Sequence, residues 1–198
     1  MRPVMNARTL LPLAALAAAC ASARPPAAAP SAPSVPGDYF PLAVGNEWVY
    51  RDESPALPPE RRAPRTVRIL ERTSEGYYRD SERGELRADP DCLHDRSRRL
   101  LCGPIARGTS WSSVVSVSST ERYEIAAVGE TVSTPAGRFD GCVRVRAHNR
   151  AERGTDHVLE ITYAPGVGPV RIETFALIGP AATPQVRAVL EKYHVGRR

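Results

Sequence analysis

The segment HVLEITY at residues 157–163 alternates apolar and polar side chains, and VRIETFA at residues 170–176 repeats this alternation after the turn sequence at 165–168. Alternation with a period of two places every second side chain on the same face of a strand, so each segment predicts a half-buried β-strand. A short Gly-rich turn between two such strands predicts an antiparallel pair. The fold prediction is built outward from this pair.

The same pattern recurs at residues 47–51, 66–71 and 143–147, and residues 111–120 form a Ser/Val-rich run with β-branched character. Turn sequences separate these segments at Glu75–Gly76, Arg83–Gly84, Val128–Glu130 and Pro135–Gly137. We therefore predict a mainly β domain over residues 38–198, built as a single curved antiparallel sheet, a half-barrel or a sandwich. Only residues 185–192 (QVRAVLEK) have helical propensity, and they are equally compatible with a closing strand.

The composition agrees with a mainly β fold. The 198 residues include 19 Pro and 14 Gly, with 6% aromatic residues, which argues against a long helical bundle. A content of 42% apolar and 25% charged residues is too polar for an integral membrane bundle. The formal charge is +5, but all of the basic residues except Lys192 are Arg, a bias that GC-rich coding can produce. We expect no nucleic-acid partner.

The N-terminus has the features of a secretory signal peptide. Residues 1–19 combine the positive charges of Arg2 and Arg8 with an apolar run from Leu10 to Ala19, which is too short to span a bilayer. The run ends in AAAC at residues 17–20, which resembles the lipobox of bacterial lipoproteins. That resemblance implies that Cys20 carries a diacylglyceryl group after cleavage directly before it. Ordinary cleavage after an Ala-x-Ala site is the alternative.

We predict that residues 20–37 form a disordered tether. The segment is dense in Ala, Pro and Ser, so it cannot bury enough apolar surface to offset its chain entropy. Such a tether lets a lipid-anchored domain stand clear of the membrane. No Asp follows Cys20, and by resemblance to the enterobacterial sorting rule this favours the outer membrane, with the domain facing the periplasm or the cell surface.

An internal repeat joins two distant parts of the chain. PLAVGNEW at residues 41–48 and PIARGTSW at residues 104–111 share the pattern P-[LI]-A-x-G-x-x-W. Gly45 and Gly108 permit the chain to reverse, and Trp48 and Trp111 then anchor the next strand. We expect the two Trp residues to be buried as equivalent anchors. Convergent turn chemistry is the alternative explanation.

Three motifs resemble a recurring set in secreted and lipid-anchored bacterial proteins of uncharacterised function. They are YFPLAVGNEWVY at 39–50, TPAGRFDGCVRV at 134–145 and YAPGVGPVR at 163–171. The resemblance implies a curved antiparallel β-sheet and assigns no catalytic residue. These motifs consist of turn and core residues and carry no chemistry of their own.

Three cysteines remain if Cys20 is acylated. An exported protein meets an oxidising environment, so we expect one disulfide and one free thiol. Cys92 and Cys102 close the shortest loop and are the favoured pair, with Cys142 bonded to either of them as the alternative. In the favoured case Cys142 is a small buried apolar side chain. No spacing of two close Cys pairs points to zinc, and we expect no metal.

The chain contains no nucleophile-elbow, zinc-protease, P-loop or dinucleotide-binding motif. We expect its four histidines to occupy solvated positions; they are His94, His148, His157 and His194. We therefore predict a non-enzymatic envelope lipoprotein without a cofactor, whose β domain binds a protein, a glycan or a lipid. A carrier-like half-barrel with an apolar concave sheet is the alternative, and a hydrolase with no recognisable motif is less favoured.

Overall fold

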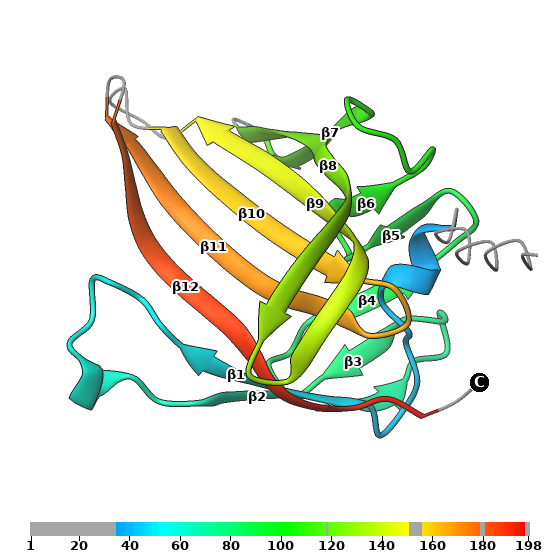
Figure 1. The fold of residues 1–198 in the computed structure, drawn as a ribbon. Helices are drawn as coiled ribbons and strands as arrows, with labels where there is room; N and C mark the ends of the chain where they lie inside the picture. The colour runs from blue at the N-terminus through cyan, green and yellow to red at the C-terminus, as the bar shows by residue number, and fades with distance from the viewer. Residues whose placement is uncertain (1–34, 118, 151–155, 179–180, 197–198) are drawn as a thin grey trace, which may run out of the picture. The chain divides into compact units, whose positions relative to one another are not determined.

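Twelve antiparallel strands form one sheet in the order β6-β5-β4-β3-β2-β1-β12-β11-β10-β9-β8-β7, and the sheet curls into a nearly closed barrel (Figure 1). The structure is a computed structural model that describes residues 35–117, 119–150, 156–178 and 181–196. The mainly β class predicted from the sequence is confirmed. Within those ranges, no helix has the length and apolar character needed to cross a membrane.

Two short 3-10 helices accompany the strands, η1 (Pro36–Tyr39) and η2 (Pro59–Arg61). The strands are β1 (Glu47–Asp52), β2 (Arg65–Arg72), β3 (Tyr78–Asp80), β4 (Glu85–Ala88), β5 (Cys92–His94), β6 (Arg99–Cys102), β7 (Ser110–Ser116), β8 (Ser119–Thr134), β9 (Gly137–Arg150), β10 (Asp156–Ala164), β11 (Gly168–Ile178) and β12 (Ala181–His194).

Residues 185–192 lie in β12 and not in a helix. β12 pairs with β11 on one side and with β1 on the other, so two ladders satisfy its backbone polar groups. Tertiary pairing therefore overrides the helical propensity of this segment. Because β1 joins β12, the N-terminal and C-terminal strands of the domain lie next to each other in the sheet.

One face of the sheet forms the core, and large side chains from both halves of the chain fill it. Trp48 is fully buried, and its indole N–H donates a hydrogen bond of 2.7 Å to the carbonyl oxygen of Val167. The Tyr50 hydroxyl donates in the same way to the carbonyl oxygen of Pro169, at 3.0 Å. β1 is thereby tied to the turn between β10 and β11. The other side chains with almost no accessible surface include Ile69, Leu93, Leu101, Ile125, Tyr163 and Leu190.

The two repeat copies have the same backbone conformation. Gly45 and Gly108 adopt φ values of +91° and +88°, in the region that favours glycine. Each donates its N–H to the carbonyl oxygen of an isoleucine on the neighbouring strand at 2.9 Å, Ile69 in the first copy and Ile125 in the second. The repeat is therefore a structural unit used twice.

Side chains extend this equivalence, but the two Trp residues differ. The Asn46 side chain in the first copy donates a 2.8 Å hydrogen bond to the carbonyl oxygen of Pro41. The Thr109 hydroxyl in the second copy donates an equivalent 2.8 Å bond to the carbonyl oxygen of Pro104. Trp48 is fully buried, whereas Trp111 is only half-buried. The expectation that both are equivalently buried is therefore wrong for Trp111, because it lies on an edge strand of the sheet.

Side chains close the barrel where the two edge strands, β6 and β7, meet. The Arg99 N–H donates to Ser113 Oγ at 2.9 Å, and the Trp111 indole N–H donates to the Arg99 carbonyl oxygen at 2.7 Å. The Arg98 guanidinium also bonds the buried carboxylate of Glu121 on β8 at 3.0 Å. We call this junction the seam, and it joins the two edges through side chains.

The sequence at Val128–Glu130 forms a bulged stretch inside β8 and not the predicted turn. β8 has three irregularities of register against β9, and Gly129 adopts a φ of +78°. Bulges bend a strand and increase its local twist. The outer half of the β8–β9 hairpin is bent in this way across β11 and β12 (Figure 1), where the Ala136 N–H donates to the Leu190 carbonyl oxygen at 3.2 Å.

The folded domain begins earlier than the expected boundary at residue 38. The sequence places Pro36 and Gly37 in the predicted tether, yet both are buried within η1. Pro presets the backbone angle at the start of this short helix, which lies against β5. The signal peptide at 1–19, the lipidation site Cys20 and the tether as far as residue 34 lie outside the described residues.

Candidate functional site

The face of the sheet opposite the core carries a ladder of alternating charges. Arg146 on β9 has Glu124 on β8 and Glu160 on β10 as its cross-strand neighbours. Its Nε atom donates to Glu160 at 2.7 Å, and its guanidinium reaches Glu124 at 3.4 Å. The side chain of Glu160 is only 10% exposed, so solvent screens this pair less than an ordinary surface ion pair.

Arg144 extends the ladder toward the hairpin. Its guanidinium donates to Glu160 at 3.2 Å and to Glu130 on the bent part of β8 at 3.0 Å. Its Nε atom is buried and has no acceptor among the described residues. Farther along the sheet, Arg187 on β12 donates to Glu173 on β11 at 2.7 Å. The charges alternate from β8 to β10 and again from β11 to β12, whereas Glu160 and Glu173 face each other as like charges between β10 and β11.

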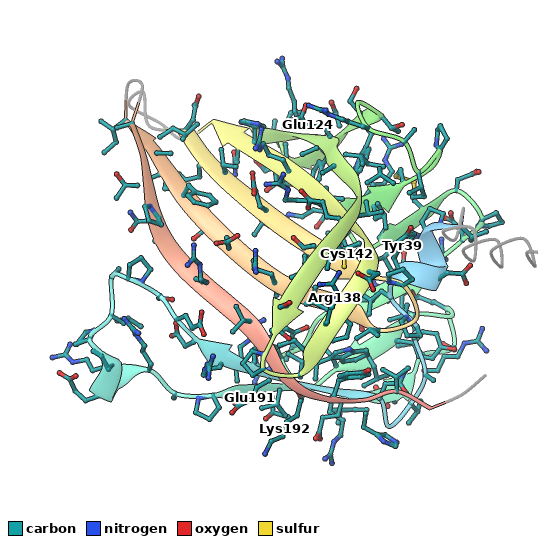
Figure 2. The ribbon with its side chains drawn as sticks, in the orientation of Figure 1. Tyr39, Glu124, Arg138, Cys142, Glu191 and Lys192 are labelled. Carbon is teal, nitrogen blue, oxygen red and sulfur yellow. A yellow bond between two sulfur atoms is a disulfide. The ribbon has the colours of Figure 1, made fainter. Side chains whose placement is uncertain are left out.

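The bent hairpin and the sheet line two open cavities beside this ladder, which share the lining residue Arg171 and which we together call the hairpin groove. The central cavity, about 250 Å³, lies between the bent part of β8 and Arg144, Thr162, Arg171 and Glu173 on strands β9 to β11. The tip cavity, about 400 Å³, lies between residues 133–135 and strands β11, β12 and β1. Figure 2 labels Glu124 and Arg138, which mark the inner and outer parts of the hairpin.

Arg171 is the residue that lines both cavities. Its cross-strand neighbours are uncharged, Thr162 on β10 and Val189 on β12. Within the described ranges its half-buried side chain makes no hydrogen bond or ion pair. The other three arginines of the groove each bond a glutamate; they are Arg51 with Glu53, Arg144 with Glu130 and Arg187 with Glu173. The positive charge of Arg171 is therefore left for another partner.

Cys142 lies at the base of the hairpin, as Figure 2 shows, and its thiol is free and fully buried. Its sulfur lies 3.5 Å from the carbonyl oxygen of Phe139. Burial raises the pKa of the thiol to about 11, although the charge of Arg171 acts in the opposite direction. A thiol with a raised pKa is a poor nucleophile near neutral pH, so this residue behaves as a small core side chain.

A third cavity, about 810 Å³, lies on the same face near the start of β8, and we call it the upper cavity. Ser110, His148 and Asp156 all line it, which are the residue types of a hydrolytic triad. No hydrogen bond joins any two of these three side chains in the described residues. The nucleophile-to-base contact that activates a serine is thus not formed here.

The predicted disulfide between Cys92 and Cys102 is present, with an S–S distance of 2.06 Å. The two residues face each other directly across β5 and β6, with Cα atoms 4.2 Å apart. The bridge therefore holds the hairpin whose outer strand forms one side of the seam. Among the described residues, no cluster of three or more His, Cys, Asp or Glu is arranged to hold a metal ion.

His94 departs from its predicted solvated position. Its side chain is only 13% exposed, and its Nε2 lies 3.2 Å from a carboxylate oxygen of Asp89. The ring also packs edge-on against Tyr77, with ring centroids 5.9 Å apart. The other three histidines are exposed as expected. His94 therefore ties the end of β5 to the loop before that strand, and it lines none of the three cavities described above.

Sequence reasoning did not find the hairpin groove. The signal was present in the outward positions of the predicted strands, because residues 143–147 alternate Val with Arg while residues 157–163 contribute Glu160. Opposite charges at matching outward positions indicate cross-strand pairs. Which charges pair depends on the order of the strands and on their register, and both are visible only in the folded sheet.

Comparisons with known proteins give no family assignment. No family model matches the chain, and no curated protein matches it. Among solved structures, the chain is similar to the crystal structure of a putative lipoprotein from Parabacteroides distasonis ATCC 8503, at 14% identity and a TM-score of 0.40. The match covers 79% of this chain and 98% of that one. A similarity at this level carries no functional inference.

Proposed function

We propose that this chain is a bacterial cell-envelope lipoprotein, anchored through acylated Cys20, whose β domain is a non-catalytic binding module. The N-terminal sequence supports the anchor, because a charged start, a short apolar run and a Cys directly after it are the signals for lipidation. The absence of Asp after Cys20 supports the outer membrane, with the domain facing the periplasm or the cell surface.

The observation that carries the binding proposal is the contrast between the two faces of the sheet. Large apolar side chains such as Trp48 and Tyr163 fill the core face, whereas the opposite face holds the hairpin groove with its arginine and glutamate side chains. A cleft with a few convergent polar groups is the usual form of a binding site. We place the polar part of a protein, glycan or lipid partner in this groove.

One experiment tests the anchor. Cells that express the chain are grown with a clickable palmitate analogue, and incorporation is compared between the wild type and Cys20→Ala. We expect label in the membrane fraction of the wild type and none in Cys20→Ala. Equal labelling of both chains contradicts the anchor.

A second experiment tests the groove. Thermal unfolding of the Cys20→Ala chain is measured separately with muropeptides and with phosphatidylglycerol vesicles. Ser133→Trp fills the tip cavity, and Ser74→Trp makes the same change at an exposed turn between β2 and β3. We expect one probe to stabilise the parent chain and Ser74→Trp but not Ser133→Trp. Stabilisation that survives in Ser133→Trp contradicts a ligand in the groove.

A carrier of acyl chains is the second candidate, and one observation favours it. Leu159, Ile161, Ile172 and Ala188 pack against the core yet remain partly exposed, and they lie side by side on the core face of β10, β11 and β12. An apolar wall of this kind suits an acyl chain. Binding of a fluorescent fatty acid that Ile161→Asp abolishes and Ser133→Trp leaves intact would favour the carrier over the groove.

A further inference from the structure

We propose that the hairpin groove binds an oxyanion, the phosphate or carboxylate group of its ligand, through the guanidinium of Arg171. This inference rests on the proposed binding function and names the chemistry of the ligand. Three observations carry it: the unpaired charge of Arg171, unused hydrogen-bonding groups beside it, and the position of the residue between the two cavities.

The unpaired charge is the first observation. Removing a guanidinium from water is costly unless an anion replaces the lost hydration, and Arg171 is half-buried without an ion pair to any carboxylate of the described residues. The three glutamates that line the groove already pair with other arginines, Glu53 at 2.6 Å, Glu173 at 2.7 Å and Glu130 at 3.0 Å. An external oxyanion would supply the partner that the chain itself does not provide. Arginine favours such groups because its planar fork donates two parallel hydrogen bonds to them.

Two hydroxyl groups line the same cavities as Arg171. The hydroxyl of Thr162 in the central cavity and that of Ser133 in the tip cavity make no hydrogen bond within the described part of the chain. Hydroxyls beside a guanidinium complete the hydrogen-bonding shell that a phosphate or carboxylate requires.

The position of Arg171 relates the site to the hairpin. Residues 133–135 of the hairpin turn lie across the tip cavity from Arg171, and the turn itself is held to β12 by the bond from Ala136 to Leu190. A ligand anchored at Arg171 therefore has a wall on each side, the sheet below and the hairpin above. The rest of the ligand extends along the tip cavity, which is the larger of the two.

The test measures phosphate binding to the full chain carrying Cys20→Ala, by amide chemical-shift titration with inorganic phosphate across the millimolar range. The key variant is Arg171→Met. The matched control is Arg138→Met, which removes the same charge at an exposed site on the hairpin, outside both cavities. We expect phosphate to shift amides of residues 131–135 and 171–173 in the parent chain and in Arg138→Met. Arg171→Met should bind at least tenfold more weakly, and Arg171→Lys should fall between.

Folding is checked independently of binding. Arg171 makes no ion pair in the described structure, so Arg171→Met should unfold at the same temperature as the parent chain or higher, and a loss of binding then reports the site itself. No phosphate-induced shift in the parent chain, or equal weakening in Arg138→Met and Arg171→Met, overturns the inference.

Lipid headgroups and soluble phosphates share this chemistry, so a second arm separates them. Flotation with vesicles of phosphatidylglycerol is compared with neutral phosphatidylcholine vesicles, using the same variants. Binding to phosphatidylglycerol that requires Arg171 assigns the oxyanion to a lipid headgroup, and phosphate binding without flotation assigns it to a soluble ligand. Probe binding that requires Ser133 and is unchanged in Arg171→Met overturns the oxyanion inference while the proposed binding function stands.

Discussion

The indole N–H of Trp111 donates a 2.7 Å hydrogen bond to the carbonyl oxygen of Arg99 and so joins the two strands at which the sheet would otherwise end. Unpaired strand edges invite pairing with other chains, and proteins protect them by covering or closing the edge. At this seam, side chains of β7 supply the partners that a regular ladder would have supplied. The stability of the barrel therefore depends on a few identifiable hydrogen bonds.

Replacing Trp111 by Phe should weaken the seam. Phe keeps an aromatic ring beside Tyr123, whose ring stacks on Trp111 at 5.6 Å, but loses the N–H donor. We expect the free energy of unfolding to fall by about 1 kcal/mol, which is typical of one lost hydrogen bond. Urea denaturation measures this, and hydrogen exchange should quicken in β6 and β7 before other strands. Unchanged exchange in these two strands would contradict a role for the seam.

Truncation of the two Trp residues should have unequal effects. Trp48→Ala removes a fully buried side chain and its hydrogen bond to Val167, so it should cost roughly 3 to 5 kcal/mol. Trp111→Ala removes a half-buried ring and should cost clearly less. Chemical denaturation of both variants decides this point. Equal losses would show that the edge position of Trp111 does not reduce its contribution.

The difference in burial between Trp48 and Trp111 could not be predicted from the repeat pattern. The pattern P-[LI]-A-x-G-x-x-W predicted the shared turn, because a left-handed glycine conformation and a backbone bond to the next strand are local properties. The burial of each Trp depends on strands far away in the chain. β1 has neighbours on both sides, whereas β7 is an edge strand, and the local pattern is the same in both cases.

Substituting either repeat glycine by Ala should destabilise the domain by a similar amount. Gly45 and Gly108 both adopt positive φ, and a Cβ added at either position meets no other atom within 4 Å. The cost is therefore conformational, roughly 1 kcal/mol in each variant. Urea denaturation of Gly45→Ala and Gly108→Ala measures it. A large difference between the two would contradict the structural equivalence of the copies.

The hairpin groove marks a second limit of prediction from sequence. The alternating segments at residues 143–147, 157–163 and 170–176 predict strands where β9, β10 and β11 lie, and the turn at Pro135–Gly137 is also predicted, but no strand is predicted over residues 121–134 of β8. Gly129, however, was interpreted as a turn residue, whereas it lies in a bulge of β8. A glycine with positive φ fits both structures, and only the pairing of β8 with β9 on either side distinguishes them. Without the bend there is no groove, so no feature of the sequence alone singles out Arg171.

The Cys92–Cys102 disulfide should stabilise the seam side of the barrel. It closes a loop with a sequence separation of 10, for which the chain-entropy model gives roughly 2 to 3 kcal/mol. Replacing both cysteines by Ala should lower the free energy of unfolding by about that amount. Urea denaturation gives the value, and peptide mapping without reduction checks the linkage. A crosslinked peptide that contains Cys142 would refute this pairing.

Cys142 should titrate and react only under alkaline or unfolding conditions. Burial raises its pKa to about 11, whereas an unfolded Cys has a pKa of about 8.5. A group whose pKa is raised on folding contributes stability that is full below the unfolded value and is lost as the pH rises toward the folded one. The stability of the Cys20→Ala chain should therefore fall between about pH 8.5 and pH 11, and adding Cys142→Ala should reduce that fall.

Iodoacetamide at pH 8 should modify Cys142 in urea and leave it unmodified in the folded chain, because the reactive thiolate is rare and the sulfur is buried. Rapid modification of the folded chain at pH 8 would mean that the base of the hairpin opens and exposes the thiol.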